Sequence, residues 1–142
     1  MKNYEYLPHT ADVKFRAYGA TLEDAFKNAA FALYNVMVDT TKVKKKMSRS
    51  IKAYGSDLPA LLQSFLEQFI ILLDTDNFFL SALNKVAIKK NSTGSYSLTA
   101  AASGDEAKNY ETIGPQVKAC TYNDMFVRKQ GKKWALQVVV DI

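Results

Sequence analysis

The chain has 142 residues, a formal net charge of +5 at neutral pH and a single cysteine. This length predicts one domain over residues 1–142, large enough to bury a core without disulfide bonds. One cysteine excludes an internal disulfide and a cysteine-rich zinc cluster, and it favours the cytoplasm. The first residues lack a signal-peptide pattern and no uninterrupted apolar run approaches a membrane span, so we expect no membrane contact.

The first half of the chain contains two copies of one predicted strand–helix unit. Each copy has an alternating strand, the tripeptide Ala-Tyr-Gly (17–19 and 53–55), an apolar helix and the dipeptide Asp-Thr. A glycine at the end of each strand suits a positive φ or the close approach of another backbone. Thr21 is the predicted N-cap of the first helix, and Ser56 or Asp57 is the predicted N-cap of the second.

Both predicted helices are apolar around most of their circumference, over residues 22–37 and 61–73. A surface helix has an apolar stripe on one side only, so these helices must be covered on more than one side. The second half of the chain supplies four predicted strands for this cover: 80–90, 96–102, 116–127 and 134–140. We therefore predict an α+β fold, a layered sandwich with two long apolar helices packed between mostly antiparallel β-sheets.

Common catalytic motifs are absent from the sequence. It contains no phosphate-binding P-loop, no dinucleotide-binding glycine pattern and no nucleophile elbow. With one histidine and one cysteine, a catalytic triad has little support. Cys120 lies in an alternating strand, and we expect it to be a small buried residue.

Residues that could bind a metal ion through oxygen atoms lie near both ends of the chain. His9 and Asp12 interrupt two strand-like segments in PHTADVKF, and Asp141 directly precedes the terminal carboxylate of Ile142. If these segments meet, the anionic oxygens converge and repel one another unless a cation neutralises them. Such hard donors suit one divalent cation, Ca²⁺, Mg²⁺ or Mn²⁺, with His9 hydrogen-bonded to a ligand. Taken singly, Asp141 is also explained as a solvated strand end and His9 as a structural histidine.

The segments HTADVKFRAYGATLEDAFKNAAFALYNVMVDT, VKACTY and VVVDI resemble the archease family, and the resemblance covers essentially the whole chain. It implies a layered βαβ-type domain and a divalent metal ion held by Asp12 and Asp141, with backbone oxygen from Ile142. It also implies a functional lysine, which corresponds to Lys118. From the sequence alone, a strand lysine that extends into solvent is the alternative explanation of Lys118.

The resemblance implies an accessory protein and not an enzyme. Proteins of this family assist tRNA-splicing RNA ligases, which they activate by promoting guanylylation, the transfer of GMP from GTP to a ligase histidine. The implied partner is therefore the ligase, with RNA contacted indirectly through it. The chain departs from the family at Pro8 and Asn123, where Asp and His are frequent, and the second departure leaves one fewer candidate ligand or partner contact at that strand.

Two other functions stay open. A general RNA-binding module or chaperone would use a basic cluster over Lys42–Lys52, although such a run is also typical of a solvated loop. The cluster consists of Lys42, Lys44, Lys45, Lys46, Arg49 and Lys52. A metal-dependent hydrolase would use Asp12 and Asp141, but His9 is the only evident general base.

Overall fold

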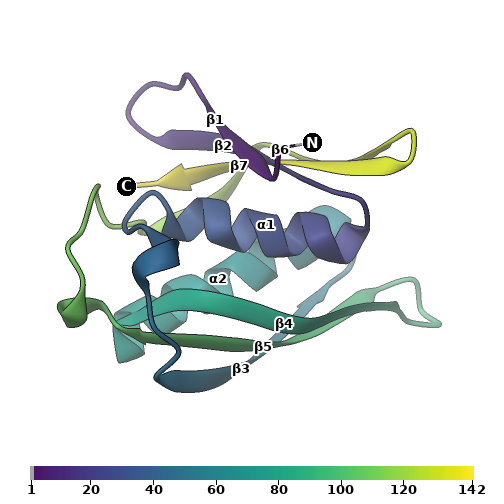
Figure 1. Cartoon of the computed structure of the whole chain (residues 1–142). Coiled ribbons are helices and arrows are strands. Elements are labelled where there is room, and N and C mark those ends of the chain that lie inside the picture. Colours follow the sequence, from purple (N-terminus) through teal and green to yellow (C-terminus); the bar gives the residue numbers. More distant parts are fainter. Residues whose placement is uncertain (1) are drawn as a thin grey trace.

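The computed structural model describes residues 2–142, and its strands form two antiparallel sheets (Figure 1). Sheet A has the strand order β1-β2-β7-β6, and sheet B has the order β3-β5-β4. Every neighbouring pair in both sheets is antiparallel. The strand bounds are Tyr4–Leu7 for β1, Val13–Gly19 for β2, Met47–Gly55 for β3, Phe78–Lys90 for β4, Tyr96–Glu106 for β5, Ala119–Gln130 for β6 and Lys133–Asp141 for β7.

Two helices, α1 (Leu22–Tyr34) and α2 (Leu58–Asp76), lie between the sheets. Figure 1 shows sheet A above them and sheet B below them. Buried side chains from both helices and from the inner faces of both sheets join in one core cluster. The predicted α+β sandwich is confirmed, although only α2, with 19 residues against 13 in α1, is a long helix. Two short 3₁₀ helices, η1 (Thr40–Lys42) and η2 (Ala107–Asn109), complete the elements.

The helix starts follow the predicted capping. The Thr21 hydroxyl accepts a hydrogen bond from the backbone N–H of Asp24 at 3.0 Å. The Asp57 carboxylate caps α2 in the same way, through the N–H of Ala60 at 2.8 Å. Pro59 lies in the first turn of α2, where its missing N–H leaves no helical hydrogen bond unmade.

The repeated strand–helix unit explains two of the glycines. A Cβ on Gly19 would lie 2.3 Å from the backbone nitrogen of Ala25, and a Cβ on Gly55 would lie 2.2 Å from that of Leu61. Neither glycine is among the residues with positive φ. Close approach of the following helix to the end of the strand is therefore the reason for glycine at both positions.

The far ends of the two units differ, and the sequence match did not indicate this difference. α1 ends at Tyr34, and Asp39 in the following turn caps η1 by accepting the Thr41 N–H at 3.1 Å. The matching Asp74 lies inside α2, which continues to Asp76. The paired Asp-Thr dipeptides therefore have different structural roles.

α2 is the one described helix that is long and apolar enough to span a membrane by length and composition. Its residues Leu61, Phe65 and Phe69 are fully buried in the core cluster. Because a helix between two sheets is apolar on several sides, this packing explains the composition of α2.

Candidate functional site

Strands β2 and β7 bring the two ends of the chain together. They pair in antiparallel register up to Val13 opposite Val140. Asp12 directly precedes this pair and Asp141 directly follows it, so the two aspartates occupy neighbouring backbone positions. Figure 1 shows the β1–β2 loop and the C-terminus at the same end of the molecule. We call this end, with Asp12, Lys118, Asp141 and Ile142, the acidic tip.

The β1–β2 loop holds His9 against Asp12. The imidazole Nδ1 of His9 contacts the carboxylate of Asp12, and the two side chains are 23% and 21% exposed. Ala11, between them, has a φ of 65°, a left-handed conformation that is uncommon for a residue with a Cβ. This turn brings the imidazole back onto the carboxylate, so His9 is placed to orient Asp12.

The end of β7 is held by the start of β6. Ala119 is the register partner of Asp141, and the backbone N–H of Lys118 donates to the carbonyl of Asp141 at 2.8 Å. Asp141 and Lys118 are exposed, whereas Ile142 packs partly against the core. Lys118 therefore lies beside the chain terminus and in contact with solvent.

Helix α2 positions β6 through the backbone of Cys120. The Glu67 carboxylate accepts the Cys120 N–H at 2.9 Å, and the Gln63 amide donates to the Cys120 carbonyl at 3.4 Å. Cys120 itself is buried, as predicted. Burial raises the pKa of its thiol to about 12, with smaller contributions from Glu67 and Asp141. The thiol is therefore protonated at neutral pH and is not available as a nucleophile.

The donors at the acidic tip fit a hard divalent cation in their chemistry. Asp12 and Asp141 offer carboxylate oxygens, and Ile142 offers the terminal carboxylate. Within residues 2–142, no three His, Cys, Asp or Glu side chains gather as a ligand set. A third protein donor for a cation at this tip would therefore be another kind of oxygen, such as an oxygen of Ile142.

Asn123, a position where the family resemblance led us to expect histidine, lies in an irregular part of β6. The register between β6 and β7 slips between Thr121 and Phe126. Within this bulge, the Asn123 N–H donates to the Thr121 hydroxyl at 3.2 Å, and Tyr122 is 58% exposed. A side chain at position 123 is therefore exposed to solvent or to another molecule and does not enter the core.

The six residues of the basic cluster Lys42–Lys52 differ in their surroundings. The guanidinium of Arg49 donates to the carboxylate of Asp76 at 2.8 Å, at the end of α2. Residues 43–46 connect η1 to β3 at one end of sheet B. Lys52 lies on the exposed side of β3. The run of charges in the sequence is thus divided among three environments.

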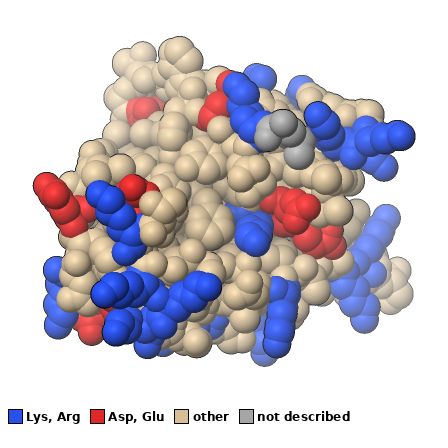
Figure 2. Space-filling model, viewed as in Figure 1, with Lys and Arg blue, Asp and Glu red and all other residues tan. Residues whose placement is uncertain are grey.

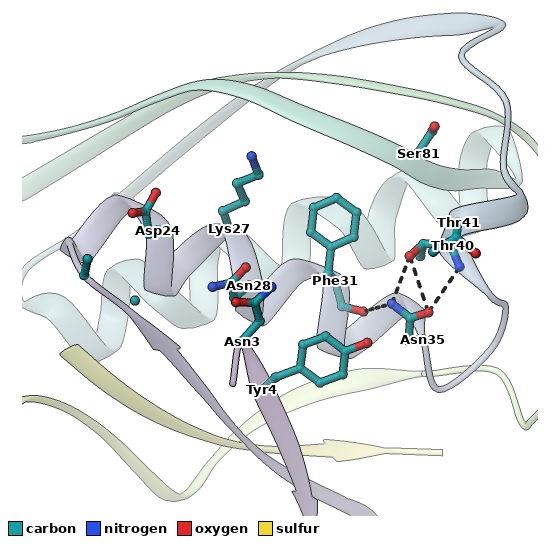
Figure 3. A pocket seen from close by; sticks show the side chains of 12 residues that line it. Asn3, Tyr4, Asp24, Lys27, Asn28, Phe31, Asn35, Thr40, Thr41 and Ser81 are labelled. Carbon is teal, nitrogen blue, oxygen red and sulfur yellow. Dashed lines mark hydrogen bonds between the residues drawn. The ribbon is translucent and has the colours of Figure 1, made fainter. Parts of the chain in front are cut away.

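A cavity of about 520 Å³ beside α1 was not predicted (Figure 3). Residues of β1, α1, η1 and β4 line it, and the Asn35 amide at its edge donates to the Thr40 hydroxyl at 3.0 Å. Four residues of α1 and its C-cap Asn35 line the cavity at positions 24, 27 and 28, 31 and 35, which is the spacing of one side of a helix. Four of these five residues are polar: Asp24, Lys27, Asn28 and Asn35. From the sequence, this spacing could have predicted one polar side on a helix that is apolar around the rest of its circumference.

Comparison with protein families and curated sequences gives consistent matches. The model of the archease protein family matches residues 4–142. Protein archease of Methanosarcina mazei is 41% identical over 145 residues, which cover 99% of this chain and 97% of the relative. Protein archease of Thermococcus gammatolerans is also 41% identical, over 100% of both chains.

Solved structures agree with these sequence matches. The solution structure of protein 1598 from Methanobacterium thermoautotrophicum has a TM-score of 0.85 and 32% identity, with full coverage of both chains. The crystal structure of an archease from Thermotoga maritima, described as a possible chaperone, has a TM-score of 0.61. It covers 96% of this chain and 94% of its own at 15% identity, and it is similar in fold alone.

Proposed function

The chain belongs to the archease family, and from this membership we propose that it is a cytoplasmic accessory protein that activates a tRNA-splicing RNA ligase. The pairing of Val13 with Val140 is the observation that supports the proposal most directly. It joins the loop that carries His9 and Asp12 to the end of the chain that carries Asp141. The residues of the acidic tip thus come from opposite ends of the sequence.

The ligands of the proposed cation are the carboxylates of Asp12 and Asp141 and the terminal carboxylate of Ile142. A bound Ca²⁺, Mg²⁺ or Mn²⁺ would supply positive charge to the phosphate oxygens of GTP in the ligase cleft. His9 holds the Asp12 carboxylate in one orientation through the contact within the loop. Lys118, exposed beside the terminus, binds a phosphate oxygen or a carboxylate of the ligase.

The reaction that this protein promotes is guanylylation of the ligase. A histidine nitrogen of the ligase attacks the α-phosphorus of GTP. The nitrogen–phosphorus bond forms, the bond from this phosphorus to the oxygen that bridges the α- and β-phosphates breaks, and pyrophosphate leaves. Because negative charge accumulates on the phosphate oxygens, cationic groups at an inserted tip would stabilise the transition state. The accessory protein forms no bond in this step, which is consistent with its lack of a catalytic motif.

The test is multiple-turnover ligation by the cognate ligase with GTP and a divalent metal. Asp12→Asn and Asp141→Asn are expected to lower the stimulation about 10- to 100-fold, because each removes one charged oxygen ligand. Glu23→Gln is the matched control, since it also removes one carboxylate but lies in the first turn of α1. Thermal unfolding of each variant establishes that it is folded.

Wild-type stimulation by both folded aspartate variants would disprove the role of the acidic tip. A direct assay of GMP transfer to the ligase, with and without this protein, separates guanylylation from later steps of ligation. Equal rates of GMP transfer in the two conditions would disprove activation at this step.

A further inference from the structure

Within residues 2–142, no element covers the outer face of sheet B, on the side away from the helices (Figure 1). The inner side is identified by its buried core residues, such as Ile51, Leu98 and Leu83. Alternate residues of β3, β5 and β4 therefore point outward. The strand register arranges them in four rows across the sheet: Ser48, Ser103 and Ala82; Ser50, Ala101 and Asn84; Lys52, Thr99 and Ala87; Tyr54, Ser97 and Lys89.

The composition of this face is unusual for a solvent-exposed sheet. Nine of its twelve side chains are small or of moderate size and most are hydroxyl-bearing or alanine, and none is acidic. The larger ones are Lys52, Lys89 and Tyr54, and the tyrosine is 62% exposed. The Oγ of Ser103 is buried, so the hydroxyl groups that this face offers are those of Ser48, Ser50, Ser97, Thr99 and Tyr54. The face is therefore rich in small hydroxyl residues and positively charged, with one exposed aromatic ring.

Further lysines surround the face at both ends of sheet B. Lys44, Lys45 and Lys46 precede β3 at one end, and Lys90 ends β4 at the other. No ion pair within residues 2–142 involves these four lysines, Lys52 or Lys89. Figure 2 shows lysine and arginine side chains gathered along this lower part of the molecule, over sheet B.

The acidic groups near sheet B are already engaged. Asp76 accepts from Arg49 at 2.8 Å, and Glu106 pairs with Lys108 at 3.3 Å. Asp105 accepts from the Tyr110 hydroxyl at 2.7 Å. Asp105 keeps its negative charge, and this charge acts on Lys46. The other lysines around the face make no ion pair within residues 2–142, so a polyanion is a complementary partner for this side.

We propose that the outer face of sheet B binds single-stranded RNA directly. Lys52 and Lys89 contact phosphates, serine and threonine hydroxyls hydrogen-bond to phosphates or ribose, and a base stacks on Tyr54. From Ser48 to Tyr54 the face extends about 20 Å, at about 3.3 Å per residue. Backbone charge and stacking act on every base, so binding is expected to tolerate different sequences.

Other partners fit this face less well. A protein interface is usually anchored by several buried aromatic or aliphatic residues, and Tyr54 is the only large side chain of that kind here. Binding to a lipid surface requires apolar side chains that enter the acyl region, and small hydroxyl residues do not supply them. The flat, cationic and hydroxyl-rich surface favours RNA.

The test is fluorescence anisotropy with a labelled oligouridylate of about 12 nucleotides, within the range of known single-strand sites. It uses this protein alone, without ligase, GTP or metal, so its result does not depend on the acidic tip. Binding is measured between about 50 and 200 mM KCl, because phosphate contacts weaken steeply with salt. The wild-type protein is expected to bind, and its affinity is expected to fall over this range.

Three variants of the face and one matched control locate the binding site. Lys52→Glu with Lys89→Glu is expected to weaken binding at least about tenfold and to reduce the salt slope by about 1.4, for two lost phosphate contacts. Tyr54→Ala is expected to weaken binding about tenfold, whereas Tyr54→Phe keeps the stacking surface and the affinity. The matched control, Lys129→Glu with Lys133→Glu, makes the same charge change at the β6–β7 hairpin of sheet A.

Several outcomes would overturn the proposal. If the wild-type protein does not bind RNA at the lowest salt concentration, the proposal is wrong. If the control pair weakens binding as much as the Lys52 and Lys89 pair, the effect is one of net charge alone and the proposal is also wrong. If the sheet B variants lose ligase in a pull-down while RNA binding is unchanged, the face is a protein-docking surface. Sedimentation with phosphatidylserine vesicles in the absence of RNA binding would indicate a lipid-binding face.

Discussion

Ala11 adopts a left-handed conformation, with a φ of 65°, between two residues whose side chains contact each other, His9 and Asp12. For a residue with a Cβ, this conformation costs about 1–2 kcal/mol. Strained residues of this kind concentrate at functional sites, where the surrounding structure holds them in place. The alanine therefore limits the freedom of the loop that carries a proposed metal ligand, at a cost in stability.

Ala11→Gly is predicted to raise the free energy of unfolding by about 0.5–1 kcal/mol. Glycine relieves a strain of about 1–2 kcal/mol, and its greater freedom in the unfolded chain opposes this gain by about 0.5–1 kcal/mol. Urea denaturation followed by circular dichroism measures the change. Ala101→Gly is the control, because Ala101 is an exposed residue within β5, where glycine lowers stability. A destabilised Ala11→Gly protein would contradict the interpretation of a strained turn.

At the scale of elements, local patterns predicted the strand–helix units well. The caps at Thr21 and Asp57 depend on contacts within one helical turn, and the alternation around Ile51 depends on the strand period. The end of α1 was harder to predict, because Val36 and Met37 continue the apolar pattern beyond the last helical residue. Local rules indicate that an element exists more reliably than where it ends.

The register between distant strands was the part that local patterns could not supply. Asp12 and Asp141 become neighbours only through the pairing of β2 with β7, which depends on the packing of the whole sandwich. We predicted both aspartates as metal ligands from residue chemistry and from the family resemblance. The rows that place Lys52, Thr99 and Ala87 on one surface likewise follow only from the register of sheet B.

Residues 43–46, which lead into β3, are tied to sheet B through Tyr110. Its hydroxyl donates to the Asp105 carboxylate at 2.7 Å and accepts the backbone N–H of Lys44 at 2.9 Å. The hydrogen bond from Tyr110 is the largest cause that lowers the pKa of Asp105 below its ordinary value of 3.8. The ionised form of Asp105 is therefore favoured in the folded protein.

Tyr110→Phe is predicted to destabilise the protein at pH 7 and to have a smaller effect below about pH 4. Folding lowers the pKa of Asp105, so the ionised carboxylate contributes fully to stability above pH 3.8. This contribution is lost as the pH falls through the pKa that Asp105 has in the folded protein. Urea denaturation at pH 7 and near pH 3 measures the difference between wild type and variant. The exposed Tyr122→Phe is the control. A Tyr110→Phe effect of equal size at both pH values would show that the hydroxyl is not coupled to Asp105.

At the scale of the whole molecule, the two proposed surfaces lie in different layers. The acidic tip is built at one end of sheet A, and the RNA-binding face is the outer side of sheet B, with the helices between them (Figure 1). A ligase that receives the tip would therefore leave the face of sheet B accessible. On both proposals, one small protein contacts the ligase cleft and the RNA strand at the same time, which would favour repeated turnover.

The free chain end at the acidic tip leads to a prediction that depends on this arrangement. A short Gly-Ser extension after Ile142 converts the terminal carboxylate into a neutral amide and moves the new terminus away from Asp12 and Asp141. It is predicted to lower the stimulation of multiple-turnover ligation at least about tenfold, as expected for a lost metal contact. The same residues inserted after Gly131, in the turn at the opposite end of β7, provide the control.

The turn at Gly131 has room for this insertion, because a Cβ built there meets no atom within 4 Å. The inserted protein is therefore expected to keep its stimulation, and thermal unfolding of both proteins checks that they are folded. Isothermal titration with Ca²⁺, Mg²⁺ or Mn²⁺ separates metal binding from contact with the ligase. If metal binding is weaker in the extended protein but not in the inserted protein, the carboxylate of Ile142 is supported as a ligand. If the extended protein keeps both the metal affinity and the stimulation of the wild type, the terminus is not part of the proposed site.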